Sequence, residues 1–529
     1  MPTQEHSAHM HKLWQALLAI AAFIVASRFF TPGFFDPLVP SHSDVWRYYA
    51  YSQEAVLPNL ITSPRPVMLI LIKLLGALPN FRWFTAGLLL PAVLVPVFLV
   101  SWAERVTNTR WPLVPTFIYF FLCFALESYH ELQLLDFGGC FAVILGVLAL
   151  NQLDTIARKS PSSEPVGAMW GGMLVLAWLS MEAKPTYALV MAGAPFLYAG
   201  RLGLRKCIVL SGSILAVVFA VLVKDKVMGS PFLDTTTAES SYRLAHDVSA
   251  VAGSFWFYAS RILPAATWPL ALLGLVLLGR ARGWRAPLAL MVLAVLAVLP
   301  MVAIPNNRLS MYSWFGSSLI LLAVPMIFIY AAGQWRLASR LVSVPLLLAG
   351  LWGIAVAEPT ARYWYESNQI ANSHMLKSLT SLQAYVRPGA KVLMAGAHNA
   401  FSPLKNDAFV RSRFKHELDW KVTVPKSDLP LIAGSRDTQR LVPTDEVVPQ
   451  DFDLVAYFAR DGRLLRIGPA TELVPLSAEQ RLARILCQEA IADPVPCLNQ
   501  VGESEASAAI AASMASAGPA AGPPSPVSD

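Results

Sequence analysis

The sequence predicts a polytopic α-helical membrane protein that ends in a small α/β domain. Of its 529 residues, 55% are hydrophobic and only 14% are charged, whereas soluble domains average about 25% charged residues. The mean hydropathy is +0.50. The apolar residues also occur in repeated long blocks, which is the pattern of successive membrane-spanning helices. A single soluble core cannot absorb that much apolar surface, so we expect the lipid bilayer to be a partner of the chain.

The formal net charge of +7 and the isoelectric point near 9.1 do not indicate a nucleic-acid-binding protein. Many of the basic residues lie in short loops between apolar blocks, where they act as topology signals. We therefore predict no nucleic-acid partner.

The apolar blocks run from Leu13 to about Ala357, and one of them is too short to cross a membrane. A spanning helix needs about 20 apolar residues, but the block 66–79 is bracketed by prolines and contains Lys73. We predict that it forms a helix lying in the membrane interface. The other blocks predict about eleven spans, at residues 13–30, 83–103, 112–128, 137–153, 167–183, 185–200, 207–223, 262–280, 286–304, 311–331 and 341–357.

The distribution of basic residues orients these spans. With the N-terminus inside, the outer turns around 129–136 and 305–310 hold only Arg308. The short inner loops then hold the basic residues Arg105, Arg110, Arg158, Lys159, Arg201, Arg205, Lys206, Arg280, Arg282, Arg285, Arg336 and Arg340, as the positive-inside rule requires. We predict a bacterial inner-membrane protein with a cytoplasmic N-terminus and a periplasmic C-terminal domain. The first block is long enough to remain as an anchor.

Residues 358–502 mix charges, prolines and short apolar runs, which predicts a soluble α/β domain. We expect a helix around 361–386, a buried strand at 391–396, a hairpin over 452–467 and a helix at 478–490. Residues 503–529 are mostly Ala, Ser, Gly and Pro, so we predict a disordered tail.

The two cysteines of the predicted periplasmic domain, Cys487 and Cys497, lie ten residues apart in the sequence. In an oxidising compartment they either form a short-loop disulfide or remain two free thiols.

Chemistry-bearing side chains converge on the predicted outer face. Charged groups beside hydrocarbon usually face a bundle interior or a water-filled cavity. Carboxylates there can act as a general base or hold a divalent cation, and Arg and Lys suit phosphate oxygens. The candidates are Asp44, Arg47, Tyr48 and Arg65 in the first loop, His130, Glu131 and Asp136 in the second, Lys184 at the next turn, Arg243 in the loop 224–261, and Arg308.

The first outer loop resembles that of the GT-C glycosyltransferases. It is most similar to the branch that holds the lipid A aminoarabinose transferases and the protein O-mannosyltransferases. In those loops an acidic residue opens a helix, an Arg-Tyr pair follows, and a basic residue with prolines introduces a short apolar helix. The matching residues are Asp44, Arg47-Tyr48, Arg65-Pro66 and Leu69–Gly76.

The resemblance covers roughly residues 13–200. An acidic residue in the second outer loop of the family is matched by Asp136, and a later Lys-Gly-Pro type turn is matched loosely by Lys184-Pro185. The chain departs from the family where Val45 replaces a second acidic residue and where Pro64-Arg65-Pro66 replaces a Glu-Lys-Pro type sequence.

The resemblance implies a membrane glycosyltransferase that uses a polyprenyl-phosphate sugar donor at the outer leaflet and transfers the sugar to a lipid, glycan or protein acceptor. Asp44 would deprotonate or orient the acceptor. Arg65, Lys184 and Arg308 would hold the phosphate. Asp136 would either order that network or bind a divalent cation such as Mg²⁺ or Mn²⁺. Arg47, Tyr48, His130, Glu131 and Arg243 are secondary or acceptor-side candidates, and His130 and Glu131 could equally be solvated loop residues.

Two other functions remain open. An O-antigen ligase or polymerase would use the 224–261 loop, with Arg243 and His246. A transporter or non-catalytic envelope assembly protein is the third alternative, but a transporter is expected to show two related halves with broken spans, and the sequence shows no such symmetry.

Overall fold

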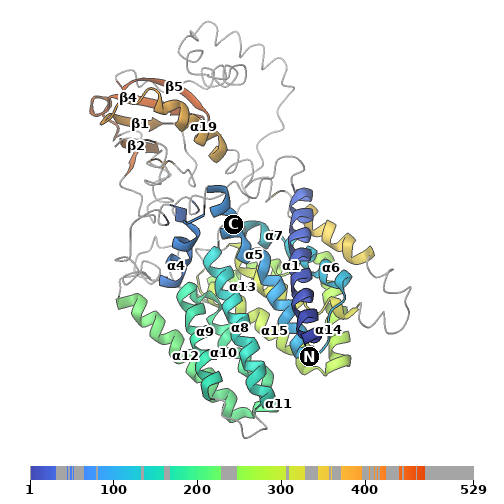
Figure 1. Ribbon diagram of the computed structural model, residues 1–529. Coiled ribbons are helices and arrows are strands. Elements are labelled where there is room, and N and C mark those ends of the chain that lie inside the picture. The colour runs from blue at the N-terminus through green and yellow to red at the C-terminus, as the bar shows by residue number, and fades with distance from the viewer. Residues whose placement is uncertain are drawn as a thin grey trace. The chain divides into compact units, whose positions relative to one another are not determined.

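The computed structural model of the protein describes the greater part of the helical region and a five-stranded sheet (Figure 1). The described residues are 2–30, 45, 48–49, 52, 65–78, 81–132, 136–159, 167–227, 247–304, 309–327, 344–356, 359, 371–395, 404, 410, 414, 418–424, 440–443, 446–459 and 462–470. The chain divides into two compact units, Met1–Pro40 with Tyr48–Trp364, and Ser41–Arg47 with Tyr365–Asp529.

The first unit is built of helices. Its longer helices are α1 (Pro2–Phe30), α5 (Phe81–Thr107), α6 (Leu113–Phe124), α8 (Phe137–Lys159), α9 (Gly167–Ala183), α12 (Leu204–Val227), α13 (Val248–Arg261), α14 (Trp268–Arg282) and α15 (Arg285–Val302). Shorter ones are α4 (Pro66–Leu75), α7 (Glu127–Leu132), the 3₁₀ turn η4 (Ala265–Thr267), the 3₁₀ turn η5 (Ser310–Ser313) and α16 (Trp314–Leu321).

In the described part of the chain, five helical segments are long and apolar enough to cross a membrane. They are Met10–Ser27, Trp83–Thr107, Phe137–Lys159, Leu204–Val227 and Arg285–Val302. The apolar helices Leu113–Phe124, Trp268–Ala281, Met311–Ile327 and Val344–Val356 are shorter. The protein is therefore a mostly helical membrane protein, as predicted, while the number of about eleven spans stays a prediction.

Helix α8 lies at the centre of the helical unit. It packs between α5 and α9, and α9 packs in turn on α12. Most side chains of α8 are buried, which matches an apolar helix without a polar face. Gly146 of α8 leaves room for Met191 of the neighbouring segment, because a Cβ on Gly146 would lie only 3.1 Å from Met191 Sδ.

Two regions differ from the predicted spans. The block 185–200 is a series of short pieces, η1 (Pro185–Tyr187), α10 (Ala188–Gly193), η2 (Ala194–Tyr198) and α11 (Ala199–Leu202), instead of one helix. Pro195, inside the block, lacks the N–H group that a continuous helix needs. The predicted outer loop 224–261 is helical at both ends, because α12 continues to Val227 and α13 begins at Val248.

The short block that we assigned to the membrane interface forms the helix α4. Pro66 provides its first turn, where a missing N–H costs nothing. Met68 and Ile72 are buried on its inner face, and Lys73 Nζ donates to the carbonyl oxygen of Ser52 at 2.8 Å. The helix itself is as expected, and its place in the membrane interface stays a prediction.

The second unit contains a five-stranded sheet with the order β3-β2-β1-β4-β5. Its strands are β1 (Lys391–Ala395), β2 (Asp419–Val424), β3 (Leu441–Pro443), β4 (Leu454–Phe458) and β5 (Leu464–Pro469). The first four pair in parallel, and β4 and β5 form an antiparallel hairpin. The predicted strand at 391–396 and the predicted hairpin are thus present.

Helix α19 (Ala371–Gln383) packs against β5 and is joined to the hairpin turn by hydrogen bonds. Ser378 Oγ donates to Gly462 O at 3.0 Å and accepts from Leu464 N at 2.9 Å. Gly462 has a φ of 86°, which glycine adopts without steric cost. The predicted helix at 478–490 and the tail 503–529 lie outside the described residues.

Candidate functional site

A buried ion pair joins two predicted site residues that are 48 positions apart in the sequence. Lys184 Nζ lies 2.6 Å from Asp136 Oδ1, and both residues are buried. Asp136 immediately precedes α8 and Lys184 immediately follows α9. Because α8 and α9 pack side by side, as Figure 1 shows, the start of one helix meets the end of the other.

Local helix geometry holds Asp136 in place. Its Oδ1 accepts a hydrogen bond from Gly139 N at 3.0 Å, which is the bond of an N-terminal capping residue. Its other oxygen, Oδ2, is buried and has no hydrogen-bond partner among the described residues. The positive end of the α8 dipole lies at the same point, so Asp136 and Lys184 meet where an anion is also favoured.

Lys184 is held from a second side by an aromatic ring. Its Nζ lies 4.9 Å from the ring centroid of Tyr312, in η5, a distance at which a cation interacts with an aromatic face. The following Pro185 starts η1 and restricts the backbone before it. The ammonium group is therefore oriented by Asp136, Tyr312 and the chain itself.

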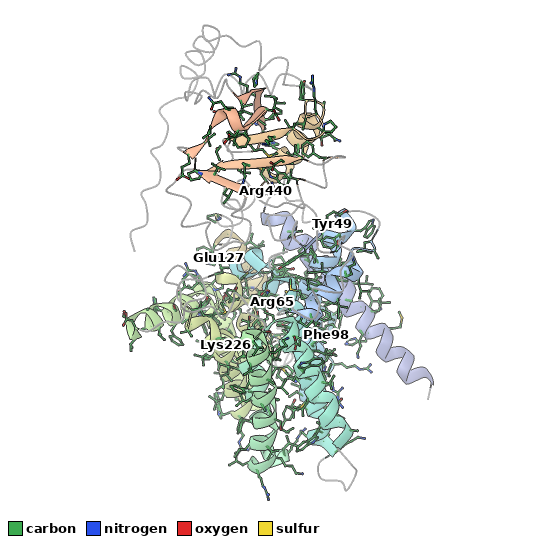
Figure 2. All side chains as sticks on the ribbon, turned by 90° about the vertical axis from the view of Figure 1, so that its left-hand side faces the viewer. Tyr49, Arg65, Phe98, Glu127, Lys226 and Arg440 are labelled. Atoms are coloured by element: carbon green, nitrogen blue, oxygen red, sulfur yellow. The ribbon has the colours of Figure 1, made fainter. Side chains whose placement is uncertain are left out.

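A second group of charged residues lies on α9, on α12 and at the start of α4. Glu182 forms an ion pair with Lys224 and accepts a hydrogen bond from Trp178 Nε1 at 3.1 Å. Lys224 Nζ is also 3.5 Å from Asp225 Oδ1. The positive charge of Arg65, which precedes α4 and is labelled in Figure 2, also acts on the Asp225 carboxylate, but less than that of Lys224 does.

Helix α4 connects the two groups. A Cβ on Gly138, two residues after Asp136, would lie 2.9 Å from Met68 Sδ of α4 and 3.1 Å from the carbonyl oxygen of Ala183. The N-terminal part of α4 therefore packs where α8 begins and α9 ends. Three cations and three carboxylates meet in this region: Arg65, Lys184, Lys224, Asp136, Glu182 and Asp225.

The sequence analysis assigned no role to Glu182, Lys224 or Asp225. Their only signal in the sequence is a charge at the edge of an apolar block, and the same is true of many residues that only set topology. Glu182 and Asp225 are buried, which is costly for a carboxylate unless it is paired.

The structure describes only part of the predicted site. Tyr48 is half-buried, and the ring of its neighbour Tyr49 packs edge-on against Phe84 of α5, with centroids 5.2 Å apart (Figure 2). His130 and Glu131 belong to α7, but their side chains are not described. The remaining predicted residues lie outside the described part of the chain, and their roles stay predictions: Asp44, Arg47, Arg243, Arg308, Cys487 and Cys497.

A divalent cation has few ligands among the described residues. In this part of the chain no group of three or more His, Cys, Asp or Glu side chains is placed to hold a metal ion. Asp136 Oδ2 is a single candidate oxygen beside an ammonium group, whereas Mg²⁺ requires near-octahedral coordination. The described donors do not by themselves fit such an ion.

A third charge cluster lies at the opposite end of α8. Asp154 is fully buried and binds Arg158 Nε at 2.8 Å and Arg105 Nε at 3.6 Å. Arg158 also donates to the carbonyl oxygen of Arg105, near the end of α5. These arginines, which we interpreted as topology signals, thus also fasten α5 to α8.

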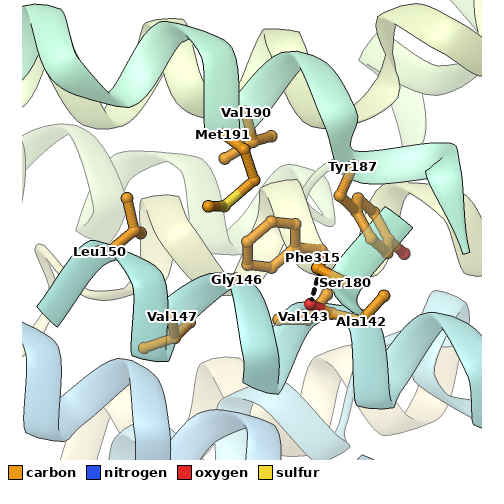
Figure 3. A pocket seen from close by; sticks show the side chains of 10 residues that line it. All are labelled: Ala142, Val143, Gly146, Val147, Leu150, Ser180, Tyr187, Val190, Met191 and Phe315. Carbon is orange, nitrogen blue, oxygen red and sulfur yellow. Dashed lines mark hydrogen bonds between the residues drawn. The ribbon is translucent and has the colours of Figure 1, made fainter. Parts of the chain in front are cut away.

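A small apolar cavity between α8, α9, α10 and α16 does not carry the chemistry (Figure 3). Its lining includes Val147, Met191 and Phe315, and the hydroxyl of Ser180, also in the lining, donates to Ala142 O at 2.8 Å. Its volume is about 10 Å³, which is room for roughly one water molecule.

The solved structures that are similar to this chain include two of an archaeal oligosaccharyltransferase. No protein-family model and no curated protein sequence matches the chain. The apo crystal structure of the oligosaccharyltransferase of Archaeoglobus fulgidus is 10% identical, with a TM-score of 0.40, over 81% of this chain and 64% of that one. The archaeal oligosaccharyltransferase AglB of Archaeoglobus fulgidus, in complex with an inhibitory peptide and a dolichol-phosphate, is 11% identical, with a TM-score of 0.41, over 84% and 69%.

The chain thus spans less than two thirds of the first of these structures. Both of these structures are of oligosaccharyltransferases.

Proposed function

We propose that the protein is a membrane glycosyltransferase that transfers a sugar from a polyprenyl-phosphate donor to an acceptor at the outer leaflet. The observation that carries the proposal is the buried Asp136–Lys184 pair, which places an oriented ammonium group at the start of α8. Lysine and a helix N-terminus both favour phosphate oxygens. The resemblance of residues 44–76 to the first outer loop of GT-C enzymes supports the same function.

The transfer step needs a base for the acceptor and a cation for the leaving group. The acceptor oxygen attacks the anomeric carbon of the sugar, and its proton passes to Asp44. The bond between the anomeric carbon and the phosphate oxygen breaks, and polyprenyl phosphate leaves with the electron pair. Arg65 and Lys184 stabilise the negative charge that develops on this phosphate, and we place Arg308 in the same role.

The described charges balance one another within the candidate site. The cations Arg65, Lys184 and Lys224 are matched by the carboxylates Asp136, Glu182 and Asp225. A buried cation without a counterion would be strongly destabilising. When the donor phosphate enters, it competes with Asp136 for Lys184.

The test is the affinity of purified protein for a polyprenyl-phosphate sugar, together with single-turnover transfer. Lys184→Met keeps the length of the side chain and removes its charge. Hydrogen bonds to charged groups contribute about 1.5–3 kcal/mol, so we expect donor affinity to fall by about 10- to 100-fold. Lys226→Ala is the matched control, because Lys226 is an exposed cation on the last turn of α12 (Figure 2).

A second variant separates binding from folding. Lys184→Met alone leaves Asp136 buried and unpaired, so the protein could lose stability for that reason. Asp136→Asn combined with Lys184→Met restores neutrality and should recover stability, but not donor affinity. Wild-type affinity in this double variant, or equal losses in Lys184→Met and Lys226→Ala, would contradict the proposed role of Lys184.

A further inference from the structure

Helix α13 shows an inverted arrangement of apolar and polar residues. Its large apolar side chains face outward: Val248 is 83% exposed and Trp256 is 72% exposed, with Val251 and Phe255 also exposed. These positions follow the spacing i, i+3, i+7 and i+8, which places them on one side of a helix. A helix that packs on a soluble protein turns such a stripe toward the core.

The inner face of α13 is polar. Ser254 and Tyr258 are fully buried, one turn apart, where α13 packs against α15 and η5. A helix at the edge of a membrane bundle is expected to have this arrangement. Its apolar side chains face the lipid, and small or polar side chains face the neighbouring helices.

The end of α13 satisfies its backbone groups inside the protein. Ser313 Oγ donates to the carbonyl oxygen of Arg261 at 3.4 Å, and Ser317 Oγ donates to that of Ile262. Both serines are buried. Carbonyl groups at a helix end are usually hydrated, but in hydrocarbon they must find partners within the protein.

The neighbouring helix α15 is a candidate span with exposed apolar side chains of its own. Helix α15, on which α13 packs, exposes Leu288, Val292 and Val295. The run 248–260 contains no charged residue, and charges appear only at its ends, as Asp247 and Arg261. An exposed apolar patch of this kind marks a membrane or protein contact.

We infer that the outward face of α13 is embedded in the bilayer and contacts lipid acyl chains, instead of belonging to an aqueous loop. Fourteen residues of helix extend about 21 Å, and the hydrocarbon core is about 30 Å thick, so α13 enters the core without crossing it alone. The predicted outer loop 224–261 is then reduced to residues 228–247, between the end of α12 and the start of α13.

The experiment places a nitroxide spin label on single cysteines at positions 252, 255 and 256 of protein in phospholipid nanodiscs. Cys487 and Cys497 are replaced by serine, and the buried Cys123, Cys140 and Cys207 remain. A label at position 249, beside Asp247, is the control at the charged end. We expect oxygen, which concentrates in hydrocarbon, to relax the three labels several-fold more than a water-soluble nickel complex, and this preference to be lost at position 249.

Dominant relaxation by nickel at 252, 255 and 256 would show an aqueous loop and overturn the inference. Low accessibility to both reagents would show that protein, such as a second copy of the chain, covers this face, and would also overturn it. An independent measurement compares Trp256→Arg with Ser249→Arg. The first should reduce the amount of folded, membrane-inserted protein several-fold, because a charge in hydrocarbon is costly, while the second should insert normally. Equal insertion of the two variants would contradict the inference. None of these results depends on glycosyltransferase activity.

Discussion

Replacing Gly139 by alanine should break the Asp136–Lys184 pair without touching either residue. A Cβ at this position would lie 2.6 Å from Asp136 Cγ and 2.7 Å from Asp136 Oδ1, far inside van der Waals contact. The Asp136 side chain is short, so it can avoid the new methyl group only by rotating. Rotation removes both the hydrogen bond from Gly139 N and the contact with Lys184 Nζ.

The size of the effect follows from two opposing contributions. Alanine is favoured over glycine in a helix by up to about 1 kcal/mol. Breaking a buried ion pair costs about 3–5 kcal/mol. The free energy of unfolding should therefore fall by about 2–4 kcal/mol, and donor affinity should fall with it because Lys184 is no longer oriented.

The measurement is denaturant unfolding of the purified protein in detergent, combined with donor binding. Gly171→Ala in α9 is the matched control: a Cβ there meets nothing within 4 Å, so this variant should be at least as stable as the wild type. If Gly139→Ala had the stability and donor affinity of the wild type, the reasoning would be refuted. The Asp136 carboxylate would then be able to move without losing its contacts with Gly139 N and Lys184 Nζ.

Three further predictions concern chemistry, pH and topology. Asp44→Asn should slow single-turnover transfer by roughly 10²–10⁴-fold with little change in donor affinity; near-normal transfer would exclude Asp44 as the base. Hydrogen bonds from Ser249 hold the pKa of Asp247 below its ordinary value of 3.8. The ionised carboxylate therefore caps α13 fully above pH 3.8, and this capping is lost as the pH falls through the lower pKa of the folded state. Amide hydrogen exchange at the start of α13 should rise in that range, and Asp247→Asn should remove the pH dependence. In spheroplasts, an impermeant thiol reagent should label Pro430→Cys but not Ser162→Cys, and the reverse pattern would invert the topology.

The fold class could be predicted from the sequence because apolar content and block length reflect the solvent of each segment. The apolar helices α5, α8 and α15 each lie within a few residues of a predicted span, since a long run of large apolar side chains has no other stable environment. The hairpin of β4 and β5 could also be predicted from the sequence. A short turn between two runs of alternating apolar and polar residues is a local pattern that indicates a hairpin.

Hydropathy could not predict how 185–200 and 248–261 are arranged. Average hydropathy does not register that Pro195 interrupts the hydrogen bonds of a helix over 185–200. It also counts the serines of α13 as polar residues, although Ser254 is buried against the protein. Which side of a helix meets protein is decided only by its neighbours.

For the candidate site, the sequence shows which charged residues lie in the predicted outer turns, and Asp136 and Lys184 are among them. Only the tertiary structure decided that these two form a buried pair, that Glu182 binds Lys224, and that Arg65 acts on Asp225. The physical reason is that ion pairing depends on distance. The distances here are set by the packing of α4, α8, α9 and α12, which join residues separated by tens of positions in the chain.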